Sequence, residues 1–329
     1  MYSNTSYVKR QHNMSGTTEM RLGYACINTV LDKQGYKVNN SCIAKTVREK
    51  GISFVIEKAK KNLENVIRIL EWNETNDIRF YRMSSDMFPH LTNPEFKQEG
   101  HVYSYPLEQF SEYFRRIGEY AYDYEHRITY HPGHYNQIGT NNKQVFEKTS
   151  IDLRYHADVL DLCKLDQNSV MVVHGGGTYG DKDTTKKRWV QQFFELPTNV
   201  QERIVIENCE RQYSVQDVID IAKQVRRPVV FDTHHHDCHS LLVEEQQPAD
   251  VYMDTILDLW KQCDVRPKFH ISEQAPTKRI GAHSDYVETI PTYFWKWHNK
   301  GHVFDLMIEA KQKEQSVFHL YNKYKLYYL

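Results

Sequence analysis

The stretch Val229–Cys238, VVFDTHHHDC, passes from three consecutive apolar residues to a cluster of potential metal ligands. A short apolar run that follows Pro228 is typical of a central strand covered on both faces, as in parallel α/β sheets. The polar residues then lie at the carboxyl end of that strand. A carboxylate followed three residues later by an imidazole can supply ligands to adjacent divalent ions. A tag-like or solvated histidine run is the alternative, but tags occur at chain ends, whereas this cluster follows a strand that we expect to be buried.

Similar apolar segments recur along the chain, and helical patterns separate them. Apolar positions repeated at three-to-four spacing predict helices over residues 54–73, 107–125, 143–164, 184–194, 214–225, 249–262 and 289–298. Strands are predicted over 20–28, 78–83, 127–131, 170–174, 203–207, 228–232, 267–271 and 303–309. Strands that alternate with helices at intervals of about 40 residues indicate an α/β (β/α)8 TIM barrel. A doubly wound open sheet is the alternative, but it would not bring residues from every strand to one site.

Composition limits the class of protein without naming its activity. Residues 1–19 are polar and aperiodic, so we expect a flexible N-terminal extension before a single barrel domain over 20–329. The 42 Lys and Arg residues nearly balance 43 Asp and Glu, which leaves binding to a polyanion open if bound dications add positive charge. Six dispersed cysteines without a CxxC pair, no signal segment and no apolar run near 20 residues predict an intracellular protein with reduced thiols and no membrane span. We expect a monomer.

Ionisable residues gather at the predicted strand ends, where a barrel of this class places its active site. The candidate metal ligands are His131, His174, Glu207, Asp232, His235, His270, His283 and Glu309. Any one of them alone could be a structural side chain, but a barrel interior would not hold so many ionisable groups without cations. Imidazole and carboxylate ligands without cysteine suit Zn, Mn or Fe, and eight ligands are enough for two or three ions. Such clusters hydrolyse phosphate esters, and we expect Glu207 and Glu309 to bridge the ions as catalytic carboxylates.

The chain resembles the ultraviolet-damage endonucleases, TIM-barrel relatives of the endonuclease IV nucleases, from Met20 to about Glu314. The resemblance rests on a series of motifs in one order: Arg21–Tyr24, Tyr81–Ser85, His131–Gly133, Val173–Gly176, Ile206–Asn208, Asp232–His235, Lys268–His270, Gly281–His283 and Glu309–Lys311. It implies an enzyme that nicks damaged double-stranded DNA on the 5′ side of pyrimidine dimers, 6-4 photoproducts and abasic sites. The expected cofactor is a cluster of two or three divalent ions, manganese first and Zn2+, Co2+ or Mg2+ as alternatives.

The same resemblance implies further site residues and exposes two departures. The family usually has a histidine ligand before a proline in the loop after the second strand, where this chain has Asn93, with His90 three residues earlier. By this match Asn93 is a further candidate metal ligand, which would bind through its carbonyl oxygen, more weakly than histidine and without charge. The pair that is similar to the family's lesion probe is His134-Tyr135 instead of Gln-Tyr. Imidazole and phenol can still stack in the space left by flipped nucleotides. By their match to the family, Tyr24 and Asn28 are expected to lie against the flipped lesion, although packing at the barrel end is the alternative.

Lys268 precedes His270 by two residues on the seventh predicted strand, so its side chain should point into the barrel with the ligands. Dications nearby would lower the pKa of an ammonium, and we expect Lys268 to be neutral or modified, for example as a carbamate. In the alternative, Lys268 bends toward the scissile phosphate and stays charged. A catalytic role is expected in either case.

Two other functions use a similar set of residues. A TIM-barrel sugar isomerase also places His, Glu and Asp at strand ends, but it needs only one or two ions and a small closed pocket. A non-catalytic damage-binding protein would need an inactive cluster, and Asn93 is the only change that hints at one. Metal stoichiometry separates the isomerase from the endonuclease.

Overall fold

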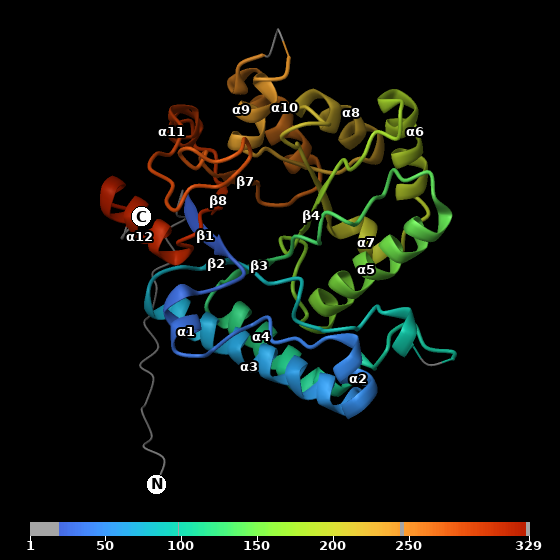
Figure 1. Cartoon of the computed structure of the whole chain (residues 1–329). Helices are drawn as coiled ribbons and strands as arrows, with labels where there is room; N and C mark the ends of the chain where they lie inside the picture. Colours follow the sequence, from blue (N-terminus) through green and yellow to red (C-terminus); the bar gives the residue numbers. More distant parts are fainter. Residues whose placement is uncertain (1–19, 98, 244–246, 327–329) are drawn as a thin grey trace.

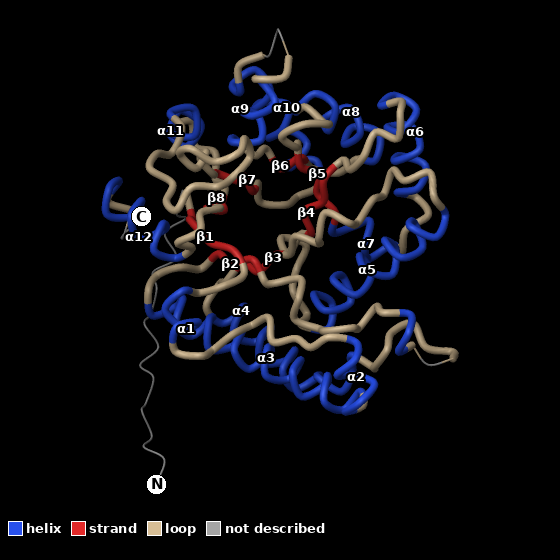
Figure 2. The backbone as a smooth tube through the Cα atoms, viewed as in Figure 1, coloured by secondary structure: helices blue, strands red, loops and turns tan. Residues whose placement is uncertain are grey.

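Eight parallel strands form the centre of the computed structural model, which describes residues 20–97, 99–243 and 247–326. One sheet has the order β3-β2-β1-β8-β7 and a second has the order β4-β5-β6. The parallel bridges Tyr130–Met171 and Asp232–His270 join the two sheets into a closed ring, which Figure 2 shows in red inside the helices. The strands are β1 (Arg21–Ala25), β2 (Phe80–Arg82), β3 (Arg127–Thr129), β4 (Met171–His174), β5 (Ile204–Glu207), β6 (Val229–Val230), β7 (Lys268–Ile271) and β8 (Asp305–Ile308). The predicted (β/α)8 barrel is confirmed.

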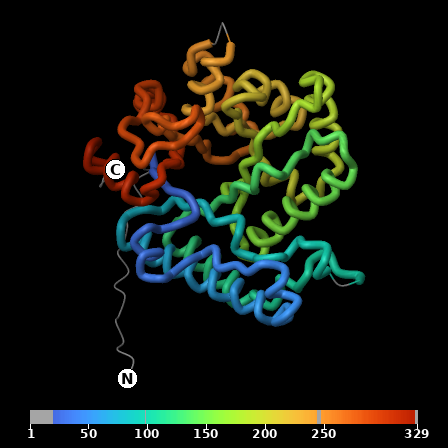
Figure 3. Tube along the Cα trace, viewed as in Figure 1, coloured from blue at the N-terminus to red at the C-terminus, as the bar shows by residue number. Residues whose placement is uncertain are grey.

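The ring closes because the first and last strands pair. Leu22 of β1 lies opposite Leu306 of β8 in parallel register. Figure 3 shows the blue start and the red end of the described chain side by side at this point. Both strands are apolar almost throughout, since helices cover the outside and side chains fill the inside.

A ring of helices surrounds the strands (Figure 1). The helices are α1 (Thr29–Lys33), α2 (Ala44–Lys50), α3 (Ile52–Thr75), α4 (Ser111–Asp123), α5 (Lys143–Leu162), α6 (Lys182–Phe193), α7 (Thr198–Arg203), α8 (Val215–Val225), α9 (Thr233–Ser240), α10 (Ala249–Gln262), α11 (Thr292–Asn299) and α12 (Glu314–Tyr324), with 3-10 turns at Pro94–Phe96 and Leu107–Phe110. All seven predicted helices are present within a few residues. Five more helices, α1, α2, α7, α9 and α12, have no counterpart in the prediction, because each is short or lacks a clear apolar stripe.

The helix α9 begins inside the histidine-rich stretch. Asp232 is its N-cap, and its side chain accepts a hydrogen bond of 2.7 Å from the backbone N–H of His235. An aspartate at the N-cap of a helix commonly accepts a hydrogen bond from the backbone N–H three residues ahead. The three-residue spacing of Asp232 and His235, which predicted a pair of metal ligands, therefore also serves to cap α9, and His235 lies in the first turn of that helix.

An ion-pair network closes the amino-terminal end of the barrel. The carboxylate of Asp305 is fully buried and lies 2.8 Å from Nη1 of Arg127, 3.0 Å from Nε of Arg21 and 2.8 Å from Nη2 of Arg266. Although burial alone would raise the pKa of Asp305, the three guanidinium groups lower it to about 2. The network ties β1, β3 and β8 together at the end of the barrel opposite the ligands.

Some predictions concern the whole chain. The extension expected over residues 1–19 lies outside the described residues. Among the residues that the structure does describe, no helix is both long enough and apolar enough to cross a membrane. All six cysteines are free, as predicted.

Candidate metal centre

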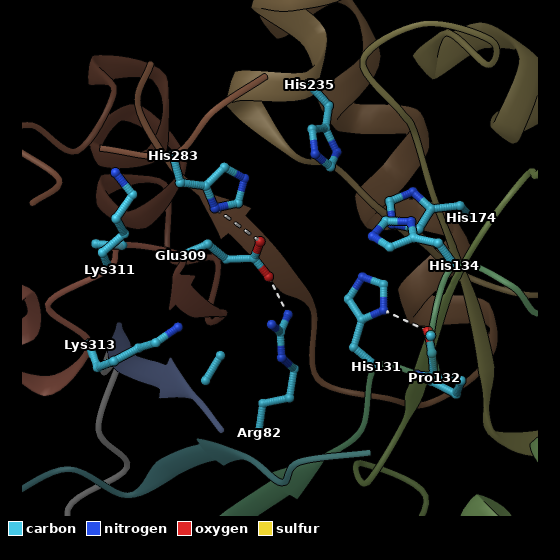
Figure 4. A pocket seen from close by; sticks show the side chains of 13 residues that line it. Arg82, His131, Pro132, His134, His174, His235, His283, Glu309, Lys311 and Lys313 are labelled. Carbon is cyan, nitrogen blue, oxygen red and sulfur yellow. Dashed lines mark hydrogen bonds and ion pairs between the residues drawn. The ribbon is translucent and has the colours of Figure 1, made fainter. Parts of the chain in front are cut away.

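The carboxyl ends of the strands bring the predicted ligands to one mouth of the barrel. His174 and Glu207 are the last residues of β4 and β5, His270 is the third residue of β7, and Glu309 follows β8 directly. Parallel strands in a barrel all end on the same side, so side chains at these positions converge. A pocket of about 300 Å³ opens above them, and Figure 4 shows several of the side chains that line it.

Glu207 is the centre of the cluster. Its Oε2 atom lies 2.9 Å from Nε2 of His131 and 3.2 Å from Nε2 of His174. Its Oε1 atom lies 2.5 Å from Nδ1 of His270 and 3.9 Å from Nδ1 of His235. One fully buried carboxylate thus faces four imidazoles from four different strand ends.

Three groups of side chains could each hold an ion, since one ligand atom from each member lies within 4.8 Å of the others. Glu207 belongs to two of these groups and so does Asp232, whereas Glu309 belongs to one. Asp232 is thus a second carboxylate shared between two groups, while the bridging role expected of Glu309 stays a prediction. The groups are His131, His174 and Glu207; Glu207, Asp232 and His235; and Asp232, His270 and Glu309.

Unpartnered polar atoms test whether cations fit this set. Nδ1 of His174, Oδ2 of Asp232 and Nε2 of His270 are buried and have no hydrogen-bond partner among the described residues. A buried polar atom without a partner is costly, and a bound cation would supply one. Imidazole nitrogens and carboxylate oxygens together are a donor set for Mn, Zn or Fe. The residues present therefore fit divalent ions.

Burial and neighbouring groups hold Glu207, His174 and His270 in the protonation states that bind metal ions. Burial alone would raise the pKa of Glu207, but the facing imidazoles hold it well below its usual range. Burial lowers the pKa of His174 and brings that of His270 to about 4, so both imidazoles are neutral near pH 7. Metal ligands must be deprotonated carboxylates and neutral imidazoles, which is the state that these shifts produce.

Asp232 and His235 differ from the other ligands, because the pKa values of both side chains are raised. Burial raises the pKa of Asp232 to about 7. Burial would lower the pKa of His235, but the charges of Asp232 and Glu207 raise it to about 9. Without a cation, this pair therefore holds a proton near neutral pH, and a bound ion would displace it.

Arg82, at the end of β2, is a site residue that the sequence interpretation missed. Its Nη1 atom forms an ion pair with Oε1 of Glu309, and Figure 4 shows this pair among the side chains that line the pocket. The available signal was its position in the Tyr81–Ser85 motif at the end of a predicted strand. His283 lies beside the same carboxylate, with Nδ1 3.9 Å from Oε2 of Glu309, but it belongs to none of the three groups.

The loop after β3 carries the expected lesion probe. The ring of His134 stacks on that of His174 with centroids 4.4 Å apart, so His134 lies at the metal centre. Tyr135 is 65% exposed, and its hydroxyl lies 3.3 Å from Oδ1 of Asp152. Both side chains are exposed, and the ring of Tyr135 lies over Gly133 at the surface of the loop.

Asn93 does not reach the cluster. Its Oδ1 atom accepts a hydrogen bond of 3.0 Å from the N–H of Glu95, and its Nδ2 atom lies 3.1 Å from Nδ1 of His90. His90 in turn contacts the carbonyl of Cys42 at 2.8 Å. In this structure the side chains of Asn93 and His90 are engaged in these local contacts, and neither residue is among those that line the pocket of the metal centre.

Tyr24 and Asn28 are likewise not available to a lesion in this structure. Tyr24 is fully buried, and its hydroxyl donates a hydrogen bond of 2.6 Å to Oδ1 of Asn73. Asn28 caps α1 by accepting from the N–H of Leu31 and donates to the Tyr24 hydroxyl at 2.9 Å. Packing at the barrel end, the alternative considered for both residues, describes their contacts.

Lys268 points into the barrel below the ligands, as predicted from its strand position. Its side chain is fully buried, and Nζ lies 3.2 Å from Oγ1 of Thr129. Burial and the nearby guanidinium groups of Arg82 and Arg127 lower the pKa of Lys268 well below its usual range. The side chain does not bend into the pocket, since it is not among the lining residues.

Comparison with solved structures shows the same fold. The crystal structure of SacUVDE superposes with a TM-score of 0.80 and 27% identity, over 93% of this chain and 99% of that one. Endonuclease IV from Thermus thermophilus superposes with a TM-score of 0.52 over 93% of this chain and 98% of that one, at 13% identity, which shows a shared fold alone.

Sequence comparison identifies the family. A homologue from Acanthamoeba polyphaga mimivirus is 36% identical over 309 residues, 93% of this chain and 91% of that protein. The UV-damage endonuclease of Schizosaccharomyces pombe is 34% identical over 93% of this chain, which spans only 51% of that longer protein. The UV DNA damage endonuclease of Bacillus cereus strain B4264 is 31% identical over 84% of each chain. The model of the family described as UV-endonuclease UvdE matches residues 20–328, and the chain belongs to this family.

Proposed function

We propose that this protein is a metal-dependent DNA-repair endonuclease that nicks the damaged strand on the 5′ side of UV photoproducts. Pyrimidine dimers and 6-4 photoproducts are the proposed lesions, with abasic sites as further substrates. The observation that carries the proposal is the buried Glu207 carboxylate, which faces four imidazoles at the mouth of the barrel. Membership of the family supports the lesion class.

Two or three divalent ions, manganese first, are the proposed cofactor. His131, His174, Glu207, Asp232, His235, His270 and Glu309 would hold them. Ions bound there would supply Lewis acidity and an activated water for phosphodiester hydrolysis.

The protein's own residues set the geometry around the ions. Glu207 and Asp232 each belong to two groups and would fix the spacing between ions. The ion pair with Arg82 holds Glu309 at the pocket floor and keeps it deprotonated, since Arg82 offsets the effect of burial on the pKa of that carboxyl. Lys268 is buried beneath the cluster, where a neutral amine or a carbamate on its side chain would change the charge next to the ligands.

Recognition of the lesion is assigned to the loop after β3. Tyr135 is exposed at the rim and would stack in the space that a flipped lesion leaves in the duplex. His134 stacks on His174 and would place this loop directly against the metal centre. An open pocket with an exposed aromatic side chain on the adjoining loop suits a polymer better than a small sugar, which favours the endonuclease over the isomerase.

Damaged double-stranded DNA is therefore the proposed partner. We further propose that the protein acts as a monomer in the compartment that holds the genome. Size-exclusion chromatography with light scattering, with and without duplex, would test the monomer.

The test of the function compares ultraviolet-irradiated and untreated duplexes of one sequence, with and without Mn2+, on a sequencing gel that locates the cut. We expect a cut only in the irradiated duplex, only with metal, and on the 5′ side of the lesion. Elemental analysis of the same preparation should give two or three ions per chain. A protein that cuts neither duplex with any of Mn2+, Zn2+, Co2+ or Mg2+ would not have the proposed function.

A further inference from the structure

Lys313 has a backbone conformation that a lysine rarely adopts. It precedes α12 with φ 49° and ψ −120°, a combination that favours glycine. A non-glycine residue held in such a region carries strain and persists only where its surroundings fix it. Lysine is also a poor N-cap, and the side chain of Lys313 makes no capping hydrogen bond. Local structure therefore gives no reason for a lysine at this position.

Contacts on both sides hold Lys313 in place. Its N–H donates to the carbonyl of Ala310 at 3.2 Å, and its carbonyl accepts from the N–H of Ser316 at 3.0 Å. The next residue, Glu314, is fully buried and accepts a hydrogen bond of 2.8 Å from the N–H of Thr29 at the start of α1. The start of α12 is thus anchored to α1, and the strain at Lys313 cannot relax by a shift of the helix.

The strained backbone directs the Lys313 side chain into the pocket. Lys313 lines the pocket of the metal centre, and Figure 4 shows its ammonium directed toward the pocket centre beside Arg82. Among the described residues, no carboxylate lies within ion-pair distance of that ammonium. The two other Lys and Arg side chains that line the pocket are paired: Arg82 contacts Glu309, and Nζ of Lys311 lies 3.4 Å from Oδ1 of Asp285.

A half-buried ammonium without an ion-pair partner costs free energy, which an anion bound beside it would offset. The anion cannot be a further carboxylate of the described chain, and the proposed substrate carries one phosphate per nucleotide. We propose that Lys313 is a phosphate-binding residue, whose ammonium receives one backbone phosphate of the damaged strand in the pocket. This inference rests on the proposed function and adds a named contact to it.

Paired charge deletions on protein and DNA test the contact. Methylphosphonate linkages remove the charge of one phosphate at a time along the damaged strand near the lesion. Binding of the metal-loaded protein is measured by stopped-flow anisotropy, which reads binding before the strand is cut. One linkage should weaken binding of the wild type about tenfold, as expected for a hydrogen bond between charged groups.

The variants decide whether that linkage belongs to Lys313. Lys313→Met should bind the unmodified damaged duplex about tenfold more weakly than the wild type, and the critical methylphosphonate should weaken it no further. Lys313→Arg should respond to that linkage as the wild type does. Lys61→Met is the control, since Lys61 is an exposed residue of α3 and its loss removes the same charge. If every methylphosphonate weakened binding of the Lys313→Met variant as much as it weakened binding of the wild type, the proposal would be overturned.

A second measurement separates function from folding. Lys313→Gly and Lys313→Ala both remove the ammonium, but only glycine adopts the observed backbone without strain. We expect the glycine variant to melt a few degrees above the alanine variant, while both lose the phosphate contact. An alanine variant at least as stable as the glycine variant, or full binding by either, would overturn the proposal.

The inference and the proposed function fail in different ways. A wild type that binds damaged duplex but never nicks it contradicts the function, while the paired deletions still test Lys313. A wild type that nicks, together with a Lys313→Met variant of equal affinity and equal rate, contradicts the inference alone. A wild type that does not bind damaged duplex overturns both.

Discussion

Nδ1 of His270 lies 2.5 Å from Oε1 of Glu207, and neither side chain is exposed to solvent. The two residues belong to β7 and β5, which are separated by β6 around the barrel. The contact therefore spans the inside of the barrel mouth, and the position of Glu207 depends on side chains from several strands at once. The charge of this one carboxylate should control the whole centre.

Glu207→Gln should lower the nicking rate at least about 100-fold and reduce the number of bound ions, because an amide lacks the charge that would hold two ions together. Glutamine has almost the same shape, so the circular dichroism spectrum of the metal-free protein should not change. Rates are measured under single turnover, and ions by elemental analysis.

Glu112→Gln is the matched control for that variant. Glu112 is an exposed residue of α4 and pairs with Arg115 on the surface, where solvent screens the pair, so its loss should change stability little and leave nicking intact. A Glu207→Gln protein that nicks as fast as this control would show that Glu207 does not bridge ions.

The barrel could be predicted from the sequence because its strands are buried on both faces. Apolar runs such as Val170–Val173 and Ile204–Ile206 are distinct from the helical patterns between them, and an ionisable residue follows each run directly. The chain position of His174 and Glu207 therefore predicted their place at the barrel mouth. The short helices α1, α2 and α7 could not be predicted in the same way, since tertiary contacts and not periodicity define them.

The site was only partly predictable, since one of its features depends on a contact distant in sequence and another on an unusual backbone conformation. Arg82 belongs to the pocket because Glu309, on the last strand, lies beside it. Lys313 belongs to the pocket because of a backbone conformation that its own sequence disfavours. Asn93 was assigned from its match to a family position, but its hydrogen bond to the N–H of Glu95 directs its side chain into a local cap.

Tyr135→Ala should weaken discrimination between damaged and undamaged duplex without changing the metal content. Tyr135 is 65% exposed on the loop after β3, and aromatic stacking contributes about 1–3 kcal/mol per base. The ratio of the two affinities should therefore fall about 5-fold to 150-fold. Tyr135→Phe, which removes only the hydroxyl near Asp152, should keep most of the discrimination. Equal losses on both duplexes would instead make Tyr135 a general DNA contact.

Lys268 should not be an ordinary ammonium in the active protein. It is fully buried, its Nζ atom lies 3.2 Å from the hydroxyl of Thr129, and Arg82 and Arg127 are close by. We expect either a neutral amine or a carbamate, whose negative charge would offset the two guanidinium groups. Native mass spectrometry distinguishes these states by the mass of carbon dioxide, and electron density beyond Nζ would locate the group. A protonated, unmodified Lys268 paired with a carboxylate would rule out both states.

Asp305→Asn should destabilise the protein most at neutral pH, because Asp305 is the common partner of Arg21, Arg127 and Arg266. Leaving a buried guanidinium such as that of Arg127 without its carboxylate costs about 3–5 kcal/mol. The pKa of Asp305 is about 2 in the folded protein, below its ordinary value of 3.8. A carboxyl with a lowered folded pKa stabilises the fold at pH values above its unfolded pKa.

The contribution of Asp305, about 2 kcal/mol from this shift, should therefore be complete above about pH 4 and lost as the pH falls through about 2. Urea unfolding is measured between pH 7 and pH 2 in the presence of a chelator, so that loss of bound metal does not enter. The difference in unfolding free energy between wild type and Asp305→Asn should shrink as the pH falls over that range. Asp285→Asn, at an exposed carboxylate paired with Lys311, should follow the wild type at every pH. A constant difference between wild type and Asp305→Asn from pH 7 to pH 2 would mean that the charge of Asp305 does not hold the three arginines, and that the asparagine acts through packing alone.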